Sequence, residues 1–177
     1  MNAQTDYKYN RLTRVLHWLS AVAILGLFAL GLWMVTLDYE HTWYDISFHY
    51  HEGIGILTAI LIAFRWLWRL ITPKPPFCSM SAFEKRAANI AHISMYALCG
   101  VIFVSGYLIL TSDGRSIAVF NWFFVPALGS FHHLQADIAG VVHLWSAYML
   151  ISLTVLHTFA ALKHHFFDKD NTLQKMI

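Results

Sequence analysis

The sequence predicts an all-α membrane protein, a single domain over residues 1–177 built as a four-transmembrane-helix bundle with both termini cytoplasmic. The composition is the first reason, because 58% of the residues are hydrophobic and only 12% are charged, where a soluble domain has roughly a quarter charged residues. The second reason is that four mainly apolar segments each reach the ~20 residues that cross a bilayer as a helix. The third is that Lys and Arg gather on one side of these segments.

The predicted spans are, in order, about residues 15–37, 51–71, 90–111 and 140–162. The first is too long for the apolar region of a signal peptide and contains a histidine, so we interpret it as a retained helix. Residues 72–82 contain prolines that end the second span. We expect a short acidic loop at 38–50. In the longest connection, 112–139, we expect the aromatic run FNWFFVPALG to lie along the membrane interface.

The basic residues predict the orientation. Arg115 alone lies on one side of the spans, and eleven of the 12 Lys and Arg residues lie on the other. The positive-inside rule therefore places both termini in the cytoplasm. No basic cluster indicates nucleic-acid binding, so we interpret these residues as topology anchors. They are Lys8, Arg11, Arg14, Arg65, Arg69, Lys74, Lys85, Arg86, Lys163, Lys169 and Lys175.

Histidine is unusually frequent, with 11 residues, several of them inside the predicted spans. Ionisable residues are costly in a membrane and are candidates for function. His143 and His157 open and close the segment HLWSAYMLISLTVLH. On a helix this spacing is about 40° short of four turns and ~21 Å along the axis. One face of the fourth span therefore offers a metal ligand near each side of the membrane.

The topology predicts a partner for each of these two histidines. His17 lies near the cytoplasmic end of the first span, at the depth of His157, and His51 opens the second span at the depth of His143. Two imidazoles at one depth do not complete a four-ligand zinc site. They suffice for a porphyrin iron, whose macrocycle supplies four further nitrogens. The sequence therefore predicts two bis-histidine b haems, held by His17/His157 and His51/His143, and such haems transfer electrons.

Other residues are weaker candidates. An arginine near a haem could bind a propionate or a quinone headgroup, or it could be a snorkelling anchor. His92 could replace His17 or His157 as a ligand, or be a packed polar residue. Glycines in the spans would let a flat macrocycle approach the backbone, or serve ordinary helix packing. The candidate propionate or quinone contacts are Arg14, Arg65, Arg69, His92 and His164, and the glycines are Gly26, Gly31, Gly53, Gly55 and Gly140.

Several motifs, spread over nearly the whole chain, resemble those of one family. RLTRVLHW stands at the entry to the first span, His51 is followed by glycines, and FRWLWRL and PKPP end the second span. HLWSAYMLISLTVLH and HHFFDKDNTL follow later in the chain. Together they resemble the bacterial cytochrome b561 family, di-haem cytochromes of the inner membrane related to the cytochrome b subunits of nickel–iron hydrogenases and formate dehydrogenases.

The resemblance implies a cytoplasmic-side haem on His17 and His157, a periplasmic-side haem on His51 and His143, and ubiquinone as redox partner. It also implies superoxide oxidation in some members, although the acidic loop at 38–50 does not favour the approach of an anion. We therefore expect transmembrane electron transfer coupled to the quinone pool, with a superoxide:ubiquinone oxidoreductase as one form of it. The alternatives are a non-enzymatic haem-bearing anchor subunit of a larger dehydrogenase or hydrogenase, and a haem-free histidine-rich metal transporter. The electron donor and the oligomeric state stay open.

Overall fold

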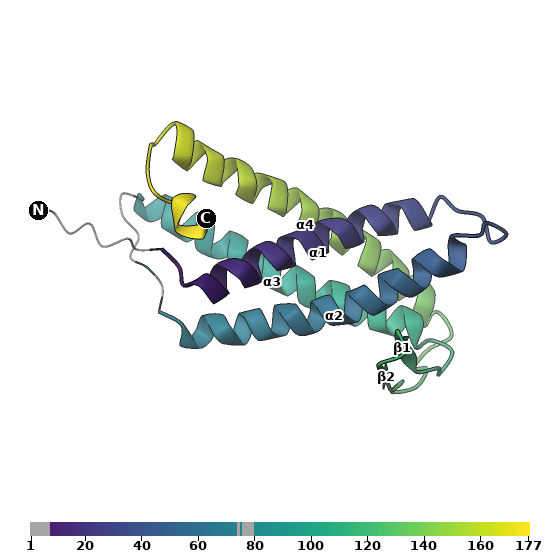
Figure 1. Cartoon of the computed structure of the whole chain (residues 1–177). Helices are drawn as coiled ribbons and strands as arrows, with labels where there is room; N and C mark the ends of the chain where they lie inside the picture. The colour runs from purple at the N-terminus through teal and green to yellow at the C-terminus, as the bar shows by residue number, and fades with distance from the viewer. Residues whose placement is uncertain (1–7, 74, 76–79) are drawn as a thin grey trace, which may run out of the picture.

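The computed structural model describes residues 8–73, 75 and 80–177 and contains four long helices (Figure 1). They are α1 (Arg11–Met34), α2 (Tyr44–Ile71), α3 (Ala82–Leu110) and α4 (Gln135–Phe166). Each is long and apolar enough to cross a membrane by length and composition. The predicted all-α membrane fold with four candidate spans is therefore confirmed. Lys74, one of the basic residues used to predict the orientation, lies outside the described residues.

The helices extend beyond the predicted apolar spans at most of their ends. α2 begins at Tyr44, so only the first part of the predicted loop at 38–50 is a loop, and α4 runs from Gln135 to Phe166 rather than from 140 to 162. α3 begins at Ala82 because Ser81 and Glu84 form a capping box, in which each side chain accepts from the other's backbone N–H. The predictions followed apolar residues, whereas a helix continues wherever polar side chains can reach water or cap its ends.

A short hairpin, which was not predicted from the sequence, follows α3. Strands β1 (Ile117–Val119) and β2 (Phe123–Val125) pair antiparallel, with Ile117 opposite Val125. Phe120 in the turn has a φ of 49°, in the left-handed region that few residues other than glycine adopt. Its ring contacts the rings of His49 and Tyr50 at the start of α2. The hairpin therefore packs against the end of the bundle where α2 begins.

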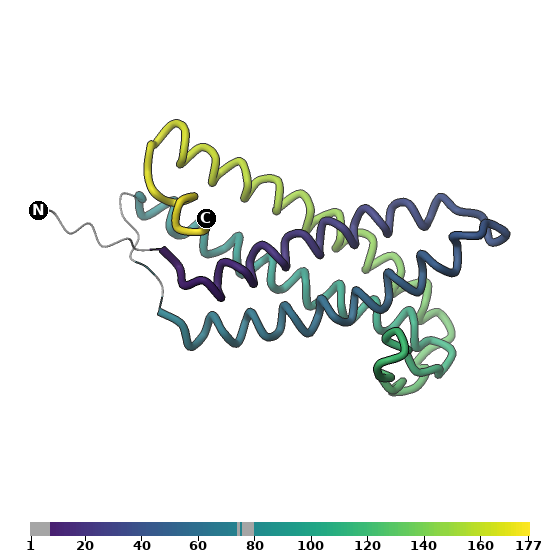
Figure 2. Tube along the Cα trace, in the orientation of Figure 1, coloured from purple at the N-terminus to yellow at the C-terminus, as the bar shows by residue number. Residues whose placement is uncertain are grey.

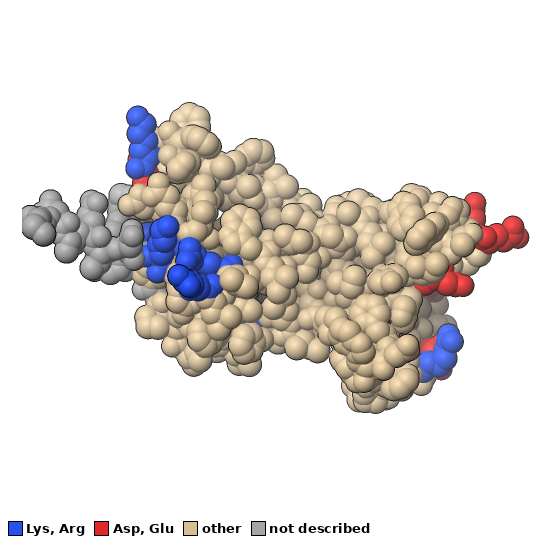
Figure 3. Space-filling model, in the orientation of Figure 1, with Lys and Arg blue, Asp and Glu red and all other residues tan. Residues whose placement is uncertain are grey.

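The four helices form two closely packed pairs, α1 with α2 and α3 with α4, and fewer contacts join the two pairs. Figure 2 shows the α1–α2 turn and the hairpin at one end of the bundle. At that end Figure 3 shows acidic side chains together with some basic ones, and most of the visible Lys and Arg lie at the opposite end. The bundle thus has chemically distinct ends.

The segment after α4 folds back onto the start of α1, and we name residues 167–177 the C-terminal strap. It ends in a short 3-10 helix, η1 (Gln174–Met176). The indole N–H of Trp18 donates to the Met176 carbonyl at 2.8 Å, and the Arg14 guanidinium donates to the Ile177 carbonyl. The strap therefore connects the end of the last helix to the beginning of the first.

Candidate functional site

His17 on α1 and His157 on α4 face each other across the gap between the two helix pairs. Their ring centroids lie 6.4 Å apart and the ring planes are inclined by 73°. A metal holds an imidazole nitrogen at ~2.0–2.1 Å, so two trans imidazoles have nitrogens ~4 Å apart and ring centroids ~6 Å apart. The observed separation matches two imidazoles on opposite sides of one metal ion.

His51 on α2 and His143 on α4 form a second pair with nearly the same geometry. Their ring centroids are 6.2 Å apart, with the planes inclined by 69°. The structure thus brings together both predicted histidine pairs, one from α1 and α4 and the other from α2 and α4. Because 14 residues of α4 separate His143 from His157, the pairs lie ~21 Å apart along that helix.

His92 on α3 is a third histidine at the His17–His157 end. Its ring centroid lies 5.3 Å from that of His157, with the planes inclined by 63°. This separation is shorter than the ~6 Å that trans ligation by two imidazoles requires. His17 therefore fits the position opposite His157 better than His92 does, and His92 lies beside the pair.

The second ring nitrogens of the paired histidines differ in their surroundings. Nδ1 of His143 lies 2.9 Å from the Ile102 carbonyl oxygen and 3.3 Å from the Ser105 hydroxyl. An Nδ1–H that donates to a carbonyl leaves Nε2 with a free lone pair, which is the usual arrangement of a metal-binding histidine. Nδ1 of His51 is buried and has no hydrogen-bond partner among the described residues.

Nδ1 of His17 instead lies 2.9 Å from a guanidinium nitrogen of Arg65. A guanidinium can only donate, so His17 accepts this hydrogen bond and, as a neutral ring, carries its proton on Nε2. Ligation through Nε2 therefore requires Arg65 to exchange His17 for another acceptor, and a carboxylate is the acceptor that a guanidinium prefers.

Most of the other predicted polar residues lie at the His17–His157 end, and only His164 lies apart from them. Arg65 and Arg69 lie over the ring of Tyr96, at 5.6 and 5.8 Å from its centroid. The Tyr96 hydroxyl and Nε of Arg14 are buried without a hydrogen-bond partner among the described residues. Tyr96 was not predicted, because a tyrosine in an apolar span gives no signal until its neighbours are known. These groups form a polar cluster at the His17–His157 end.

His164 belongs to a separate ion-pair network at the end of α4. Its Nδ1 lies 2.8 Å from Asp170 and 3.0 Å from Asp168. Lys163 lies 3.0 Å from Glu84 and 2.6 Å from Asp168. Glu84, His164 and Asp168 are close enough to hold a metal ion, but the Lys163 ammonium already pairs with both carboxylates. We interpret the network as a structural connection between α3, α4 and the C-terminal strap.

A cavity lies between the helix pairs beside His51 and His143. All four helices line it, mainly with apolar residues such as Phe28, Ile102 and Leu150. An apolar cavity that contains two facing imidazoles fits a flat, largely apolar metal complex. The residues present therefore fit a bis-histidine haem at this pair.

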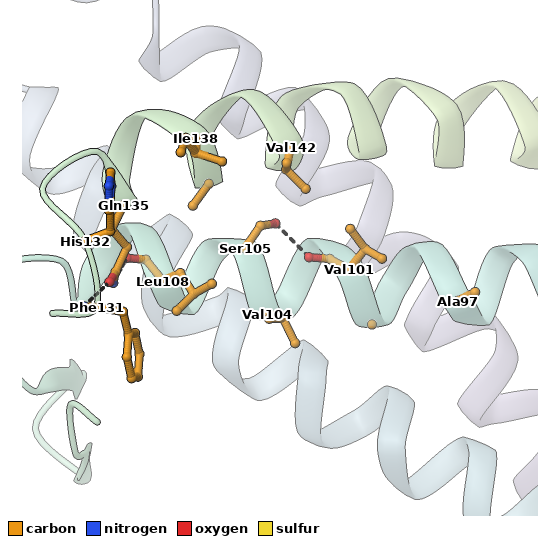
Figure 4. A pocket seen from close by; sticks show the side chains of 12 residues that line it. Ala97, Val101, Val104, Ser105, Leu108, Phe131, His132, Gln135, Ile138 and Val142 are labelled. Carbon is orange, nitrogen blue, oxygen red and sulfur yellow. Dashed lines mark hydrogen bonds between the residues drawn. The ribbon is translucent and has the colours of Figure 1, made fainter. Parts of the chain in front are cut away.

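A second cavity lies between α3 and the start of α4 (Figure 4). Val101, Leu108 and Val142 give it apolar walls. Its polar side chains are bonded to the backbone: Ser105 donates to the Val101 carbonyl at 2.7 Å, and Gln135 to the Leu108 carbonyl at 2.9 Å. This cavity suits an apolar chain better than a ligand that needs hydrogen bonds.

Comparison with known proteins gives a consistent result. The family model described as prokaryotic cytochrome b561 matches residues 8–177. The chain is 47% identical over 174 residues to cytochrome b561 homolog 2 of Escherichia coli (strain K12), covering 98% of this chain and 93% of that protein. It is 28% identical over 135 residues to cytochrome b561 homolog 1 of the same organism, covering 73% and 72%. It is 34% identical over 133 residues to a Yersinia pestis protein named as a probable superoxide oxidase, again covering 73% and 72%.

Proposed function

The chain belongs to the prokaryotic cytochrome b561 family and is therefore a bacterial membrane electron-transfer protein, and we propose that it holds two b haems. The family implies b-type haem, and the resemblance based on sequence motifs is confirmed. A haem held by two histidines would supply a one-electron iron couple. His17 and His157 would hold one haem, and His51 and His143 the other.

The observation that carries this proposal is the matched geometry of the two histidine pairs. Both ring separations, 6.4 and 6.2 Å, fit trans ligation of one metal, and each pair joins α4 to one helix of the other helix pair. His143 already donates from Nδ1 to a backbone carbonyl, which orients its Nε2 as a ligand. Arg65 would leave His17 for a haem propionate, because a carboxylate is its stronger acceptor.

The polar cluster at the His17–His157 end supports a quinone as redox partner. Arg14, Arg69, His92 and Tyr96 offer donors close to this pair, and the second cavity has its polar groups engaged elsewhere. We propose that ubiquinone binds at this end. The test is quinone-reduction kinetics on Arg69→Ala, with His164→Ala, in the separate ion-pair network at the end of α4, as the control. Unchanged KM and kcat in Arg69→Ala would remove this site.

We place both termini on the cytoplasmic side of the inner membrane, because most of the visible Lys and Arg lie at the end with the strap (Figure 3). The His51–His143 pair then lies toward the periplasm, where Asp38, Glu40 and Asp45 are exposed. These carboxylates repel a superoxide anion. A cationic or neutral electron donor therefore fits this end better, although one relative is named as a probable superoxide oxidase.

An anchor subunit of a larger complex is the second candidate function, since nothing in the bundle itself identifies the donor. Affinity purification from membranes under mild detergent separates the two functions. A stoichiometric partner, together with no quinone turnover by the isolated chain, would establish the anchor. Quinone turnover by the isolated chain would exclude it.

A haem count tests the proposal as a whole. The chain is purified in detergent, and the pyridine haemochrome of the wild type is compared with those of His143→Ala and His157→Ala. We expect two b haems in the wild type and the loss of one in each variant. His49→Ala is the matched control, because His49 lies on α2 two residues from His51 but pairs with Glu52. A folded wild type without haem would refute the proposal.

A further inference from the structure

Two glycines contact the His51–His143 pair at unusually short range. A Cβ at Gly31 on α1 would lie 3.2 Å from Cε1 of His51. A Cβ at Gly106 on α3 would lie 3.2 Å from Cε1 and 3.3 Å from Nδ1 of His143. All three distances are below the 3.4–4 Å of ordinary van der Waals contact. The edge of each imidazole ring therefore contacts a glycine of the neighbouring helix.

We propose that Gly31 and Gly106 are positioning residues that set where the His51 and His143 rings stand in the gap between the helix pairs. This inference rests on the proposed function, in which these two rings ligate one iron. Trans ligation fixes the ring separation at ~6 Å, so a displacement of a few tenths of an ångström by a new methyl group would disturb it. Glycine allows each ring to lie against the backbone of the neighbouring helix.

The contact is specific to these two glycines. Gly26 on α1 and Gly100 on α3, which share helices with them, would have nothing within 4 Å of an added Cβ. In the part of the chain that the structure describes, no glycine meets the ring of His17 or His157 in this way. Substitution at Gly31 or Gly106 should therefore affect one histidine pair and leave the other unchanged.

The two positions should differ in sensitivity. The His143 ring is fixed by its contacts with the Ile102 carbonyl and the Ser105 hydroxyl, at 2.9 and 3.3 Å. It cannot move away from a methyl group at position 106 without breaking them. The His51 ring has no hydrogen bond at Nδ1, so it can shift when Gly31 is replaced. We therefore expect Gly106→Ala to have the larger effect.

The experiment uses the full chain in detergent and compares Gly31→Ala and Gly106→Ala with the matched controls Gly26→Ala and Gly100→Ala. Haem per chain and the EPR spectrum of the ferric low-spin haems are measured for each, since the spectrum reports the orientation of the ligand rings. We expect Gly106→Ala to lose one haem, and Gly31→Ala to keep both with one altered EPR signal. Both controls should match the wild type.

The same substitutions in a His157→Ala background show which haem responds. There the remaining haem belongs to the His51–His143 pair, so Gly106→Ala should abolish binding. A wild type without haem would refute the proposed function. A wild type with two haems, and glycine variants with unchanged haem content and EPR spectra, would overturn only the positioning role. Equal losses in the controls, or a response of the other haem, would overturn it too. If Gly106→Ala does not fold, the comparison of the EPR spectra of Gly31→Ala and Gly26→Ala tests the positioning role.

Discussion

Gln135 connects three parts of the chain at the start of α4, and its replacement gives a prediction with a defined size. The side chain is only 7% exposed. Its amide nitrogen donates to the Leu108 carbonyl at 2.9 Å, and its amide oxygen accepts from the Phe131 N–H at 2.8 Å. The carbonyl lies in the last turn of α3, where helix geometry leaves it without a partner in its own helix. Gln135 therefore satisfies two backbone groups that would otherwise be unpaired.

The variant Gln135→Leu keeps a similar shape and removes both hydrogen bonds. A hydrogen bond between membrane helices contributes ~0.6 kcal/mol on average, and one in a soluble core ~1 kcal/mol. We therefore expect the free energy of unfolding to fall by about 1–3 kcal/mol. The assay is reversible unfolding in mixed detergent micelles with increasing SDS. Gln174→Leu, at an exposed position in η1, is the control and should change stability by less than about 0.5 kcal/mol. A Gln135→Leu protein as stable as this control would refute the reasoning.

Two further predictions concern packing and pH. Gly53→Ala would place a Cβ 2.9 Å from the aromatic ring in the hairpin turn, and such overpacking costs about 1–3 kcal/mol. Gly26→Ala, at an exposed position of α1, meets nothing within 4 Å and should stabilise the helix by about 0.5–1 kcal/mol. Equal unfolding midpoints in SDS would contradict this. Burial raises the pKa of Asp170, but hydrogen bonds from Thr172 and His164 outweigh burial and lower it below 3.8. The stabilisation is therefore complete above pH 3.8 and lost as the pH falls through the lower folded value. Asp170→Asn should unfold at a lower temperature than the wild type at pH 7. If the difference in unfolding temperature between the two proteins stays equally large at a pH below the folded pKa of Asp170, this explanation is excluded.

The four helices could be predicted from sequence because an apolar run of ~20 residues has few other stable structures. Their ends could not be predicted from hydropathy, since α2 begins ahead of the predicted span and includes polar residues such as Asp45 and Ser47. The capping box of Ser81 and Glu84 was readable as Ser-x-x-Glu, and it would have placed the start of α3 correctly. The hairpin has strands of three residues, too short for an alternating pattern, and its turn residue Phe120 does not have the sequence signature of a left-handed position.

The histidine pairs were predictable because helix geometry and membrane topology together fix depth and face. Their surroundings were not, because the contacts of Gly106, Ser105 and Tyr96 depend on the rotation of α3 about its axis relative to α2 and α4. Among the glycines named from the sequence, Gly55 lines the cavity beside His51 and His143, whereas Gly31 and Gly53 meet the side chains of other elements. Spacing along one helix does not determine which residue of the next helix lies opposite.

α4 contributes one histidine to each pair, and this has a consequence for the synthesis of the protein. A ribosome makes α1, α2 and α3 first, and these carry His17 and His51 without a partner in the pairs observed here. Neither pair can form until the last helix has entered the membrane beside the others. Loading of the two proposed haems would therefore be a step after translation, and a chain that stops before α4 would release a membrane protein unable to complete either histidine pair.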